Sequence, residues 1–144
     1  MKITIIGSGN MGGAIAKGLS QGSIFQANDI TCTAQTDETL EKMRHINEAF
    51  NLTHDNINAV READIVVIAV KPWRVQSIIE EIRPALQFDK QIIVSIAAGV
   101  TFEQLNGFLT KTTTSKAHVN PVIFRVMPNT AIEVKSSMTF ISAY

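Results

Sequence analysis

A glycine-rich turn near the start of the chain has the composition and spacing that hold a dinucleotide. Residues 2–6, which are β-branched from Ile3 onward, lead directly into Gly7-Ser8-Gly9-Asn10-Met11-Gly12. In such a turn the first glycine permits a tight bend, the second lets a pyrophosphate reach bare backbone, and the third lets helix and strand pack closely. The helix expected over residues 10–20 directs its unpaired N–H groups and partial positive charge at the phosphates. The turn therefore predicts dinucleotide binding, and an incidental glycine turn is the alternative.

The end of the second expected strand indicates which dinucleotide is bound. A site that prefers NAD usually carries Asp or Glu about 20 residues after the glycines, where it binds the ribose 2′-hydroxyl. Here the strand tip reads Thr33-Ala34-Gln35-Thr36. A 2′-phosphate would meet no buried like charge there, and Gln35 and the Thr36 hydroxyl can donate hydrogen bonds to it. We therefore predict NADP; NAD stays an alternative, because no Lys or Arg lies at the tip and Asp37 and Glu38 follow it.

Three further segments follow expected strands and carry small or polar residues. They cover residues 69–72, 95–101 and 125–130. In open α/β sheets ligands bind outside the carboxyl ends of the strands, so these segments are candidates to line the same site as the glycine turn. Lys71 in the first segment is either part of that site or a solvated charge at a strand end.

Strand and helix patterns alternate along the chain. Residues 65–70 form an unbroken apolar run, as expected for a central parallel strand covered on both faces. Further strands are expected at residues 2–6, 29–33, 51–53, 91–95 and 122–127, with an edge strand over 137–142. Helices are expected at residues 10–20, 37–46, 56–62, 75–84 and 101–109, and a polar loop at 111–116. These elements predict one α/β domain over residues 1–144, a doubly wound, mostly parallel, Rossmann-like sheet.

With these strings in place, the chain resembles pyrroline-5-carboxylate reductase. The resemblance includes the glycine turn, the string Ser-Ile-Ala-Ala-Gly-Val-Thr at residues 95–101, and Met-Pro-Asn-Thr at residues 127–130. It also includes Ser137-Met138-Thr139. It covers nearly the whole chain, in the family's order and spacing, and the two longer strings are much more specific than the glycine turn.

The resemblance implies hydride transfer from NADPH to the C=N carbon of a cyclic imine, which yields L-proline in proline biosynthesis. It implies the pyrophosphate at residues 6–11, the adenosine side near residues 34–36 and 69–72, and the nicotinamide toward residues 95–97. Pro128 and Asn129 would approach the nicotinamide and the substrate, and no catalytic residue is assigned. The implied cofactor-binding residues are Ile6, Gly7, Ser8, Gly9, Asn10, Met11, Ala34, Gln35, Thr36, Asn56, Ala69, Val70, Lys71, Pro72, Ser95, Ile96 and Ala97.

Several of these residues also have plain structural interpretations. Thr36 and Asn56 are both good helix N-caps. Ser95 and Asn129 can satisfy backbone groups of their own loops, as short polar side chains commonly do. We expect Trp73 to pack at the start of a helix and Met127 to pack beneath a strand end. The three histidines share no spacing typical of metal ligands, so no metal site is expected: these are His45, His54 and His118.

The bulk composition excludes other classes of function. The chain has 144 residues, of which 45% are hydrophobic, and its 13 basic side chains balance 13 acidic ones. That balance gives no electrostatic reason to bind nucleic acid or an anionic membrane. The longest apolar run is too short to span a bilayer and no secretory signal precedes the first strand, so we expect a cytoplasmic protein. The single cysteine, Cys32, lies in an expected strand and is interpreted as a buried apolar residue.

The chain departs from the family pattern in two respects. Residue 131 is Ala where the family usually reads Pro, so the backbone of that loop is less restricted. Family members continue into a helical domain that forms the dimer and completes the substrate site. We therefore expect this chain to be the cofactor-binding half of a homo-oligomeric enzyme, nearly inactive alone. The alternatives are a β-hydroxyacid-type dehydrogenase, an NADP oxidoreductase that uses a deazaflavin partner, and a nucleotide-sensing module without chemistry of its own.

Overall fold

Seven strands form a single sheet, which confirms the doubly wound, mostly parallel architecture. The computed structural model describes residues 1–110 and 120–144, and the loop expected at residues 111–116 lies outside them, as does His118. The order across the sheet is β3-β2-β1-β4-β5-β6-β7, and all pairs are parallel except β6 with β7. The strands are β1 (Ile3–Ile6), β2 (Ile30–Thr33), β3 (Asn51–Thr53), β4 (Ile65–Ile68), β5 (Ile92–Ser95), β6 (Val122–Met127) and β7 (Phe140–Ala143).

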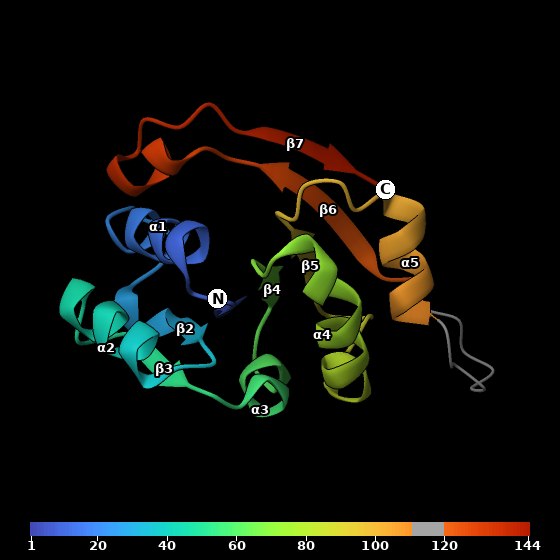
Figure 1. Ribbon diagram of the computed structural model, residues 1–144, viewed down its shortest axis with the longest axis horizontal. Coiled ribbons are helices and arrows are strands. Elements are labelled where there is room, and N and C mark those ends of the chain that lie inside the picture. Colours follow the sequence, from blue (N-terminus) through green and yellow to red (C-terminus); the bar gives the residue numbers. More distant parts are fainter. Residues whose placement is uncertain (111–119) are drawn as a thin grey trace.

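Helices cover both faces of the sheet. The structure has α1 (Asn10–Ser20), α2 (Asp37–Ile46), α3 (Asn56–Arg61), α4 (Val75–Ile82) and α5 (Phe102–Thr110). Helices α1 and α2 lie on one face, and α3, α4 and α5 lie on the other (Figure 1). Among the described residues, no helix is long and apolar enough to cross a membrane.

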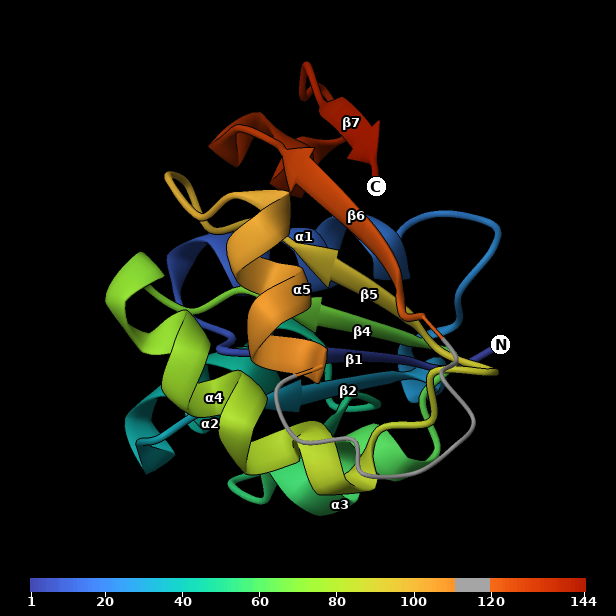
Figure 2. The ribbon, with the colours of Figure 1, turned by 90° about the vertical axis from the view of Figure 1, so that its right-hand side faces the viewer.

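The chain reverses its direction of winding at β1. It proceeds outward from β1 through β2 to β3, then returns to place β4 on the opposite side of β1. The arrowheads of β2, β4, β5 and β6 point to the same side of the molecule (Figure 2). The loops that follow β1, β2, β4 and β5 therefore meet at one edge, and the reversal opens a crevice between them, where open α/β sheets bind ligands.

The central strands are buried on both faces. In β1 and β4, Ile5 and Val67 pack against α1 and α2, whereas Ile6 and Ile68 pack against α4. This explains the apolar run without polar alternation in β4. The strand ends at Ile68, two residues earlier than expected, and Val70 instead lines the crevice beside the glycine turn.

Helix α4 buries one apolar stripe, as its spacing predicts. Its buried residues are Val75, Ile78, Ile79 and Ile82. Residues 69–71 connect β4 to a 3-10 turn, η2 (Pro72–Arg74), which leads directly into α4. Trp73 in this turn is 78% exposed, so the expectation that it packs at the helix start is wrong.

The chain's last part forms a hairpin at the edge of the sheet. Strand β7 runs antiparallel to β6, and it covers residues 140–143 rather than the expected 137–142. Residues 137–139 do not belong to the strand. The Ser137 hydroxyl forms a hydrogen bond with the Thr139 hydroxyl at 2.9 Å. Met127 at the end of β6 is 50% exposed, so the expectation that it is covered there is wrong.

The connection from β6 to β7 returns across α1. It contains η4 (Thr130–Val134), where Glu133 forms an ion pair with Lys17 of α1 at 2.9 Å. A Cβ added to Gly18 would lie 2.4 Å from the carbonyl oxygen of Ile132, so helix and turn are in close backbone contact. The turn begins at Thr130, which lines the crevice together with Asn10 and Met11 at the start of α1.

The single cysteine gives a test of this core. Cys32 in β2 is fully buried, which confirms its interpretation as an apolar residue, and burial raises the pKa of its thiol to about 12. We expect the native chain to react very slowly with Ellman's reagent and the unfolded chain to react fast, because only an exposed thiolate attacks. All signal comes from this residue, since the chain has one cysteine. Rapid labelling of the native chain would contradict the buried position of β2.

Candidate functional site

Two of the three glycines in the turn between β1 and α1 leave no room for a side chain. Gly7 has a φ of 90°, and a Cβ there would lie 3.0 Å from the Ala69 carbonyl oxygen. A Cβ on Gly12 would lie 2.2 Å from the Gly7 carbonyl oxygen, whereas a Cβ on Gly9 would meet no atom within 4 Å. Gly7 and Gly12 therefore serve the fold, and Gly9 presents bare backbone at an open position.

Hydrogen bonds fasten the turn to the end of β2. The backbone nitrogens of Gly7 and Ser8 donate to the Thr33 carbonyl oxygen at 3.1 and 2.8 Å. The Ser8 hydroxyl donates to the same oxygen at 2.9 Å, so this side chain is turned inward and buried. Helix α1 begins with Gly9 as its N-cap, without a side-chain cap and without an acidic residue in its first turn. Its first N–H groups therefore keep their positive potential at the edge of the sheet.

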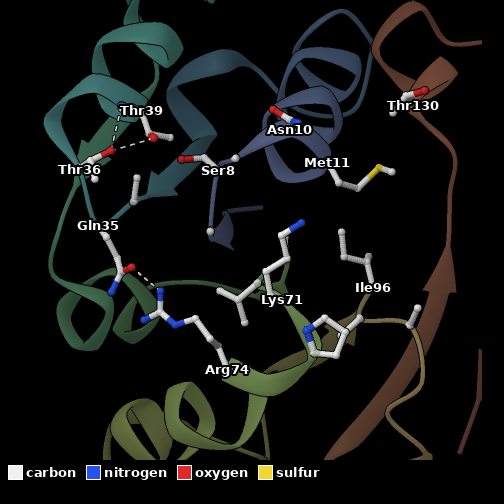
Figure 3. A pocket seen from close by; sticks show the side chains of 18 residues that line it. Ser8, Asn10, Met11, Gln35, Thr36, Thr39, Lys71, Arg74, Ile96 and Thr130 are labelled. Carbon is white, nitrogen blue, oxygen red and sulfur yellow. Dashed lines mark hydrogen bonds between the residues drawn. The ribbon is translucent and has the colours of Figure 1, made fainter.

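The loops that follow β1, β2, β4 and β5 enclose one elongated cavity of about 680 Å³. Figure 3 shows side chains from all four loops facing it. Most of the cofactor-binding residues predicted from the sequence come together here. The cavity is lined by Gly7, Ser8, Gly9, Asn10, Met11, Ala34, Gln35, Thr36, Thr39, Ala69, Val70, Lys71, Pro72, Arg74, Ile96, Ala97, Ala98 and Thr130.

The two ends of the cavity differ in chemistry. At one end Gln35, Thr36, Thr39 and Arg74 provide polar side chains, and at the other Ile96 and its neighbours provide apolar and small ones (Figure 3). Between them Lys71 extends from the loop after β4 toward the start of α1 (Figure 3). A polar end, a cationic middle and a more apolar end match the adenosine, pyrophosphate and nicotinamide parts of a dinucleotide.

A recess of about 300 Å³ continues the polar end, and two further predicted residues line it, Ile6 and Asn56. The expectation that Asn56 caps its helix is wrong: Asp55 is the N-cap of α3 and accepts from the Asn58 backbone nitrogen at 2.9 Å. The Asn56 amide instead accepts from the Thr33 hydroxyl at 2.6 Å and donates to Glu81 at 3.1 Å. This side chain therefore ties the tip of β2 to α4.

Three predicted residues line neither the cavity nor its recess: Ser95, Pro128 and Asn129. The Ser95 side chain is buried, and its hydroxyl accepts from the Ala97 backbone nitrogen at 3.4 Å. Asn129 caps η4, where its Oδ1 accepts from the Ala131 backbone nitrogen at 3.1 Å. Their plain structural interpretations are therefore confirmed. Contact of Ser95 with a cofactor, and of Pro128 and Asn129 with nicotinamide or substrate, stays a prediction.

Four lining residues were not predicted: Thr39, Arg74, Ala98 and Thr130. Thr39 follows Thr36 by one helical turn, and its backbone nitrogen donates to the Thr36 hydroxyl at 3.3 Å, which confirms Thr36 as the cap of α2. Ala98 and Thr130 belong to strings that the sequence already singled out. Arg74 could not be assigned to the site from local sequence, because it lies 39 residues from Gln35 in the chain. Its guanidinium donates to the Gln35 side chain at the β2 tip.

An imidazole lies beside the polar end. His54 contacts the Ala34 carbonyl oxygen through Nδ1 at 2.6 Å and Asp37 through Nε2 at 2.8 Å. Both acceptors are oxygens, so both ring nitrogens donate only in the imidazolium form. The hydrogen bond to Ala34, followed by that to Asp37, raises the pKa of His54 above its usual value of 6.5. In its charged form this residue neutralises the acid that follows the β2 tip.

Comparison with known proteins agrees with this geometry. A family model described as "NADP oxidoreductase coenzyme F420-dependent" matches residues 2–99, which hold β1 to β5 and nearly all of the cavity lining. The chain belongs to this family. Pyrroline-5-carboxylate reductase 2 of Dictyostelium discoideum is 36% identical over 142 residues, which cover 97% of this chain and 44% of that relative.

Solved structures extend the likeness to the whole chain. A pyrroline-5-carboxylate reductase from Coxiella burnetii is 32% identical with a TM-score of 0.83, covering 99% of this chain and 49% of its own. Plasmodium falciparum pyrroline carboxylate reductase, crystallised with NADP bound, shares the fold with a TM-score of 0.81 at 24% identity, over 100% of this chain and 48% of its own. The resemblance seen in the sequence is confirmed, and the chain spans about half the length of these relatives.

The glycine turn gives a test by substitution. We expect Gly12→Ala to lower the free energy of unfolding by about 1–3 kcal/mol or more, because the new methyl group overlaps the Gly7 carbonyl oxygen. Gly9→Ala is the matched control, since its methyl group enters open space, and the expected loss is less than about 1 kcal/mol for a weaker N-cap. Urea denaturation measures both. Equal losses for the two variants would contradict the close packing at Gly12.

A titration tests the contact between His54 and Asp37. Asp37→Asn replaces the carboxylate that faces the imidazolium with a neutral amide, which is a weaker acceptor without charge, so we expect the pKa of His54, followed by NMR, to fall. A group whose pKa is higher in the folded than in the unfolded chain stabilises the fold when it is protonated. This stabilisation is fully present at pH values below the unfolded pKa of about 6.5, and it is lost as the pH rises through the folded pKa. The variant should therefore be less stable than the original chain at low pH and should converge with it at alkaline pH. An unchanged pKa of His54 would show that this contact does not form.

Proposed function

We propose that the chain binds NADP(H) and forms the cofactor-binding half of a pyrroline-5-carboxylate reductase, which reduces 1-pyrroline-5-carboxylate to L-proline. The observation that carries this proposal is the bare backbone at Gly9, open to a cavity at the point where the sheet reverses its winding. The names of relatives that are similar along the whole chain support the choice of reaction.

The residues at the middle of the cavity fit a pyrophosphate. Backbone N–H groups at residues 9–11, at the uncapped start of α1, provide donors without a basic surface. Lys71 adds one positive charge on the opposite wall (Figure 3). A side chain at Gly9 would fill the space that the phosphates need.

The small and apolar end fits the nicotinamide. When bound, the reduced ring supplies the hydride for the reaction. In our proposal Ile96, Ala97 and Ala98 on one side and Thr130 on the other hold the ring in one orientation and exclude water from one face. A protonated imine is already electrophilic, so this half of the enzyme has to position the ring rather than activate the substrate.

The remaining half of the site would come from a second, helical domain of a longer protein, which also forms a homo-oligomer. This chain covers 44% of its Dictyostelium relative, so a protein of that length has room for such a domain. Large exposed apolar side chains gather on the β6–β7 hairpin and its flanks, as expected for a surface that another domain covers: these are Met127, Val134, Met138, Phe140, Ile141 and Tyr144.

We place the reaction in the cytoplasm as part of the same proposal. An unpaired thiol in a buried strand is typical of a protein that folds in a reducing compartment.

A second candidate is an NADP oxidoreductase that uses coenzyme F420, a deazaflavin. The description of the family model favours it. The family model ends at residue 99, however, whereas the similarity to a pyrroline-5-carboxylate reductase extends over 142 residues and covers 97% of this chain. We therefore prefer the reductase of the cyclic imine.

Calorimetry and a steady-state assay test the proposal. We expect the chain to bind NADPH, and Gly9→Asp to abolish binding without unfolding the chain, because the new carboxylate occupies the phosphate position and repels it. The chain alone should reduce pyrroline-5-carboxylate hardly at all, and a longer protein that contains it should do so with NADPH. Reduction of F420 but not of the imine would favour the second candidate. A chain that binds no nucleotide would refute both.

A further inference from the structure

We propose that Arg74 selects NADP over NAD by binding the 2′-phosphate of the adenosine ribose, with Gln35 as the residue that positions its guanidinium. This inference rests on the proposed function and adds a residue that decides the cofactor. Its starting point is the tip of β2, where an NAD site would carry an acid and this chain carries Gln35.

Arg74 reaches that tip from a different loop. It lies in η2, which follows β4, and its Nη1 donates to the Gln35 side-chain oxygen across the polar end of the cavity (Figure 3). The strand order places the loops after β2 and β4 on either side of β1, so the two side chains meet over the glycine turn. Arg74 is half-buried and lines both the cavity and the recess that continues it.

The positive charge of Arg74 is not compensated. Its side-chain partner is the neutral amide of Gln35, and none of the ion pairs found among residues 1–110 and 120–144 includes it. A guanidinium carries five N–H donors in a planar fork, and one bond to Gln35 leaves the others for an anion. Phosphate and carboxylate oxygens match that fork best.

The acids that surround this end are engaged elsewhere. Asp37 contacts His54 at 2.8 Å, and Glu38 pairs with Lys42 at 2.7 Å. Glu81, which lines the recess, accepts from the Asn56 amide at 3.1 Å. These carboxylates are hydrogen-bonded to other side chains, so none of them occupies the guanidinium of Arg74.

The residues at the β2 tip form few favourable interactions with the ribose 2′-hydroxyl of NAD. The ribose 2′-hydroxyl of NAD gains most from a carboxylate that accepts its proton, and no acid replaces Gln35 at the tip. Arg74 only donates, so with a neutral hydroxyl it forms one hydrogen bond, without the opposite charge and the bidentate geometry that a phosphate provides. Removing Arg74 should therefore affect the two cofactors very differently.

Binding titrations with NADPH and NADH side by side test this inference. We expect Arg74→Ala to weaken NADPH binding about 10- to 100-fold, the equivalent of one charge-assisted hydrogen-bond set, and to change NADH binding less than about threefold. Gln35→Glu is nearly isosteric and leaves Arg74 in place but supplies it with a carboxylate. It should likewise weaken NADPH far more than NADH.

Two controls separate this role from others. Arg44→Ala removes the same charge from the far end of α2, where Arg44 pairs with Glu41 at 3.3 Å, and should change neither affinity. Lys71→Ala should weaken both cofactors by similar factors, because the pyrophosphate is common to them. Urea denaturation of each variant confirms that it is folded.

The outcomes are distinguishable. If Arg74→Ala weakens both cofactors equally, or neither, Arg74 is not the selector and the inference fails while the proposed function stands. If the original chain binds neither cofactor, the proposed function itself fails. Retained NADPH preference in Gln35→Glu would also overturn the inference, since a guanidinium already paired with a carboxylate cannot bind the phosphate as well.

Discussion

At Gly12, α1 lies so close to the glycine turn that an added methyl group would overlap the Gly7 carbonyl oxygen. This approach fixes the first turn of the helix directly beyond β1, and the hydrogen bonds of Gly7 and Ser8 to Thr33 fix the turn against β2. Because β4 flanks β1 on the other side, its following loop must pass beside the same turn. The position of the cavity beside the start of α1 follows from this steric constraint together with the order of the strands.

The cavity has positive potential although the chain has no excess of basic side chains. Backbone donors at the start of α1 carry the main positive potential, which agrees with a chain whose 13 basic and 13 acidic side chains balance. Lys71 and Arg74 add charge at two separate positions along the cavity. Nearby carboxylates such as Asp37 are held by neighbouring side chains. Local arrangement, rather than net charge, therefore decides what binds.

Local sequence carried enough information to predict the sheet and the glycine turn. The apolar run of β4 and the stripe of α4 are periodic signals that burial imposes directly on the sequence. The exact start of a helix was harder to predict from the sequence. Asp55 rather than Asn56 is the N-cap of α3, because two adjacent residues that both favour this position compete for it. The pair of Arg74 and Gln35 could not be predicted at all, since its members are joined only by the order of the strands.

The contact between α1 and η4 also restricts which segments of this chain can be exchanged for those of a homologous protein. Gly18 touches the backbone of Ile132, and the Lys17–Glu133 pair and the bond from Lys135 to the Gln21 carbonyl oxygen lie beside it. A chimaera that exchanged the first hundred residues for those of a homologue would break this seam unless residues 130–136 came from the same parent. Residues 130–136 and α1 would therefore have to be exchanged together, although some hundred positions separate them.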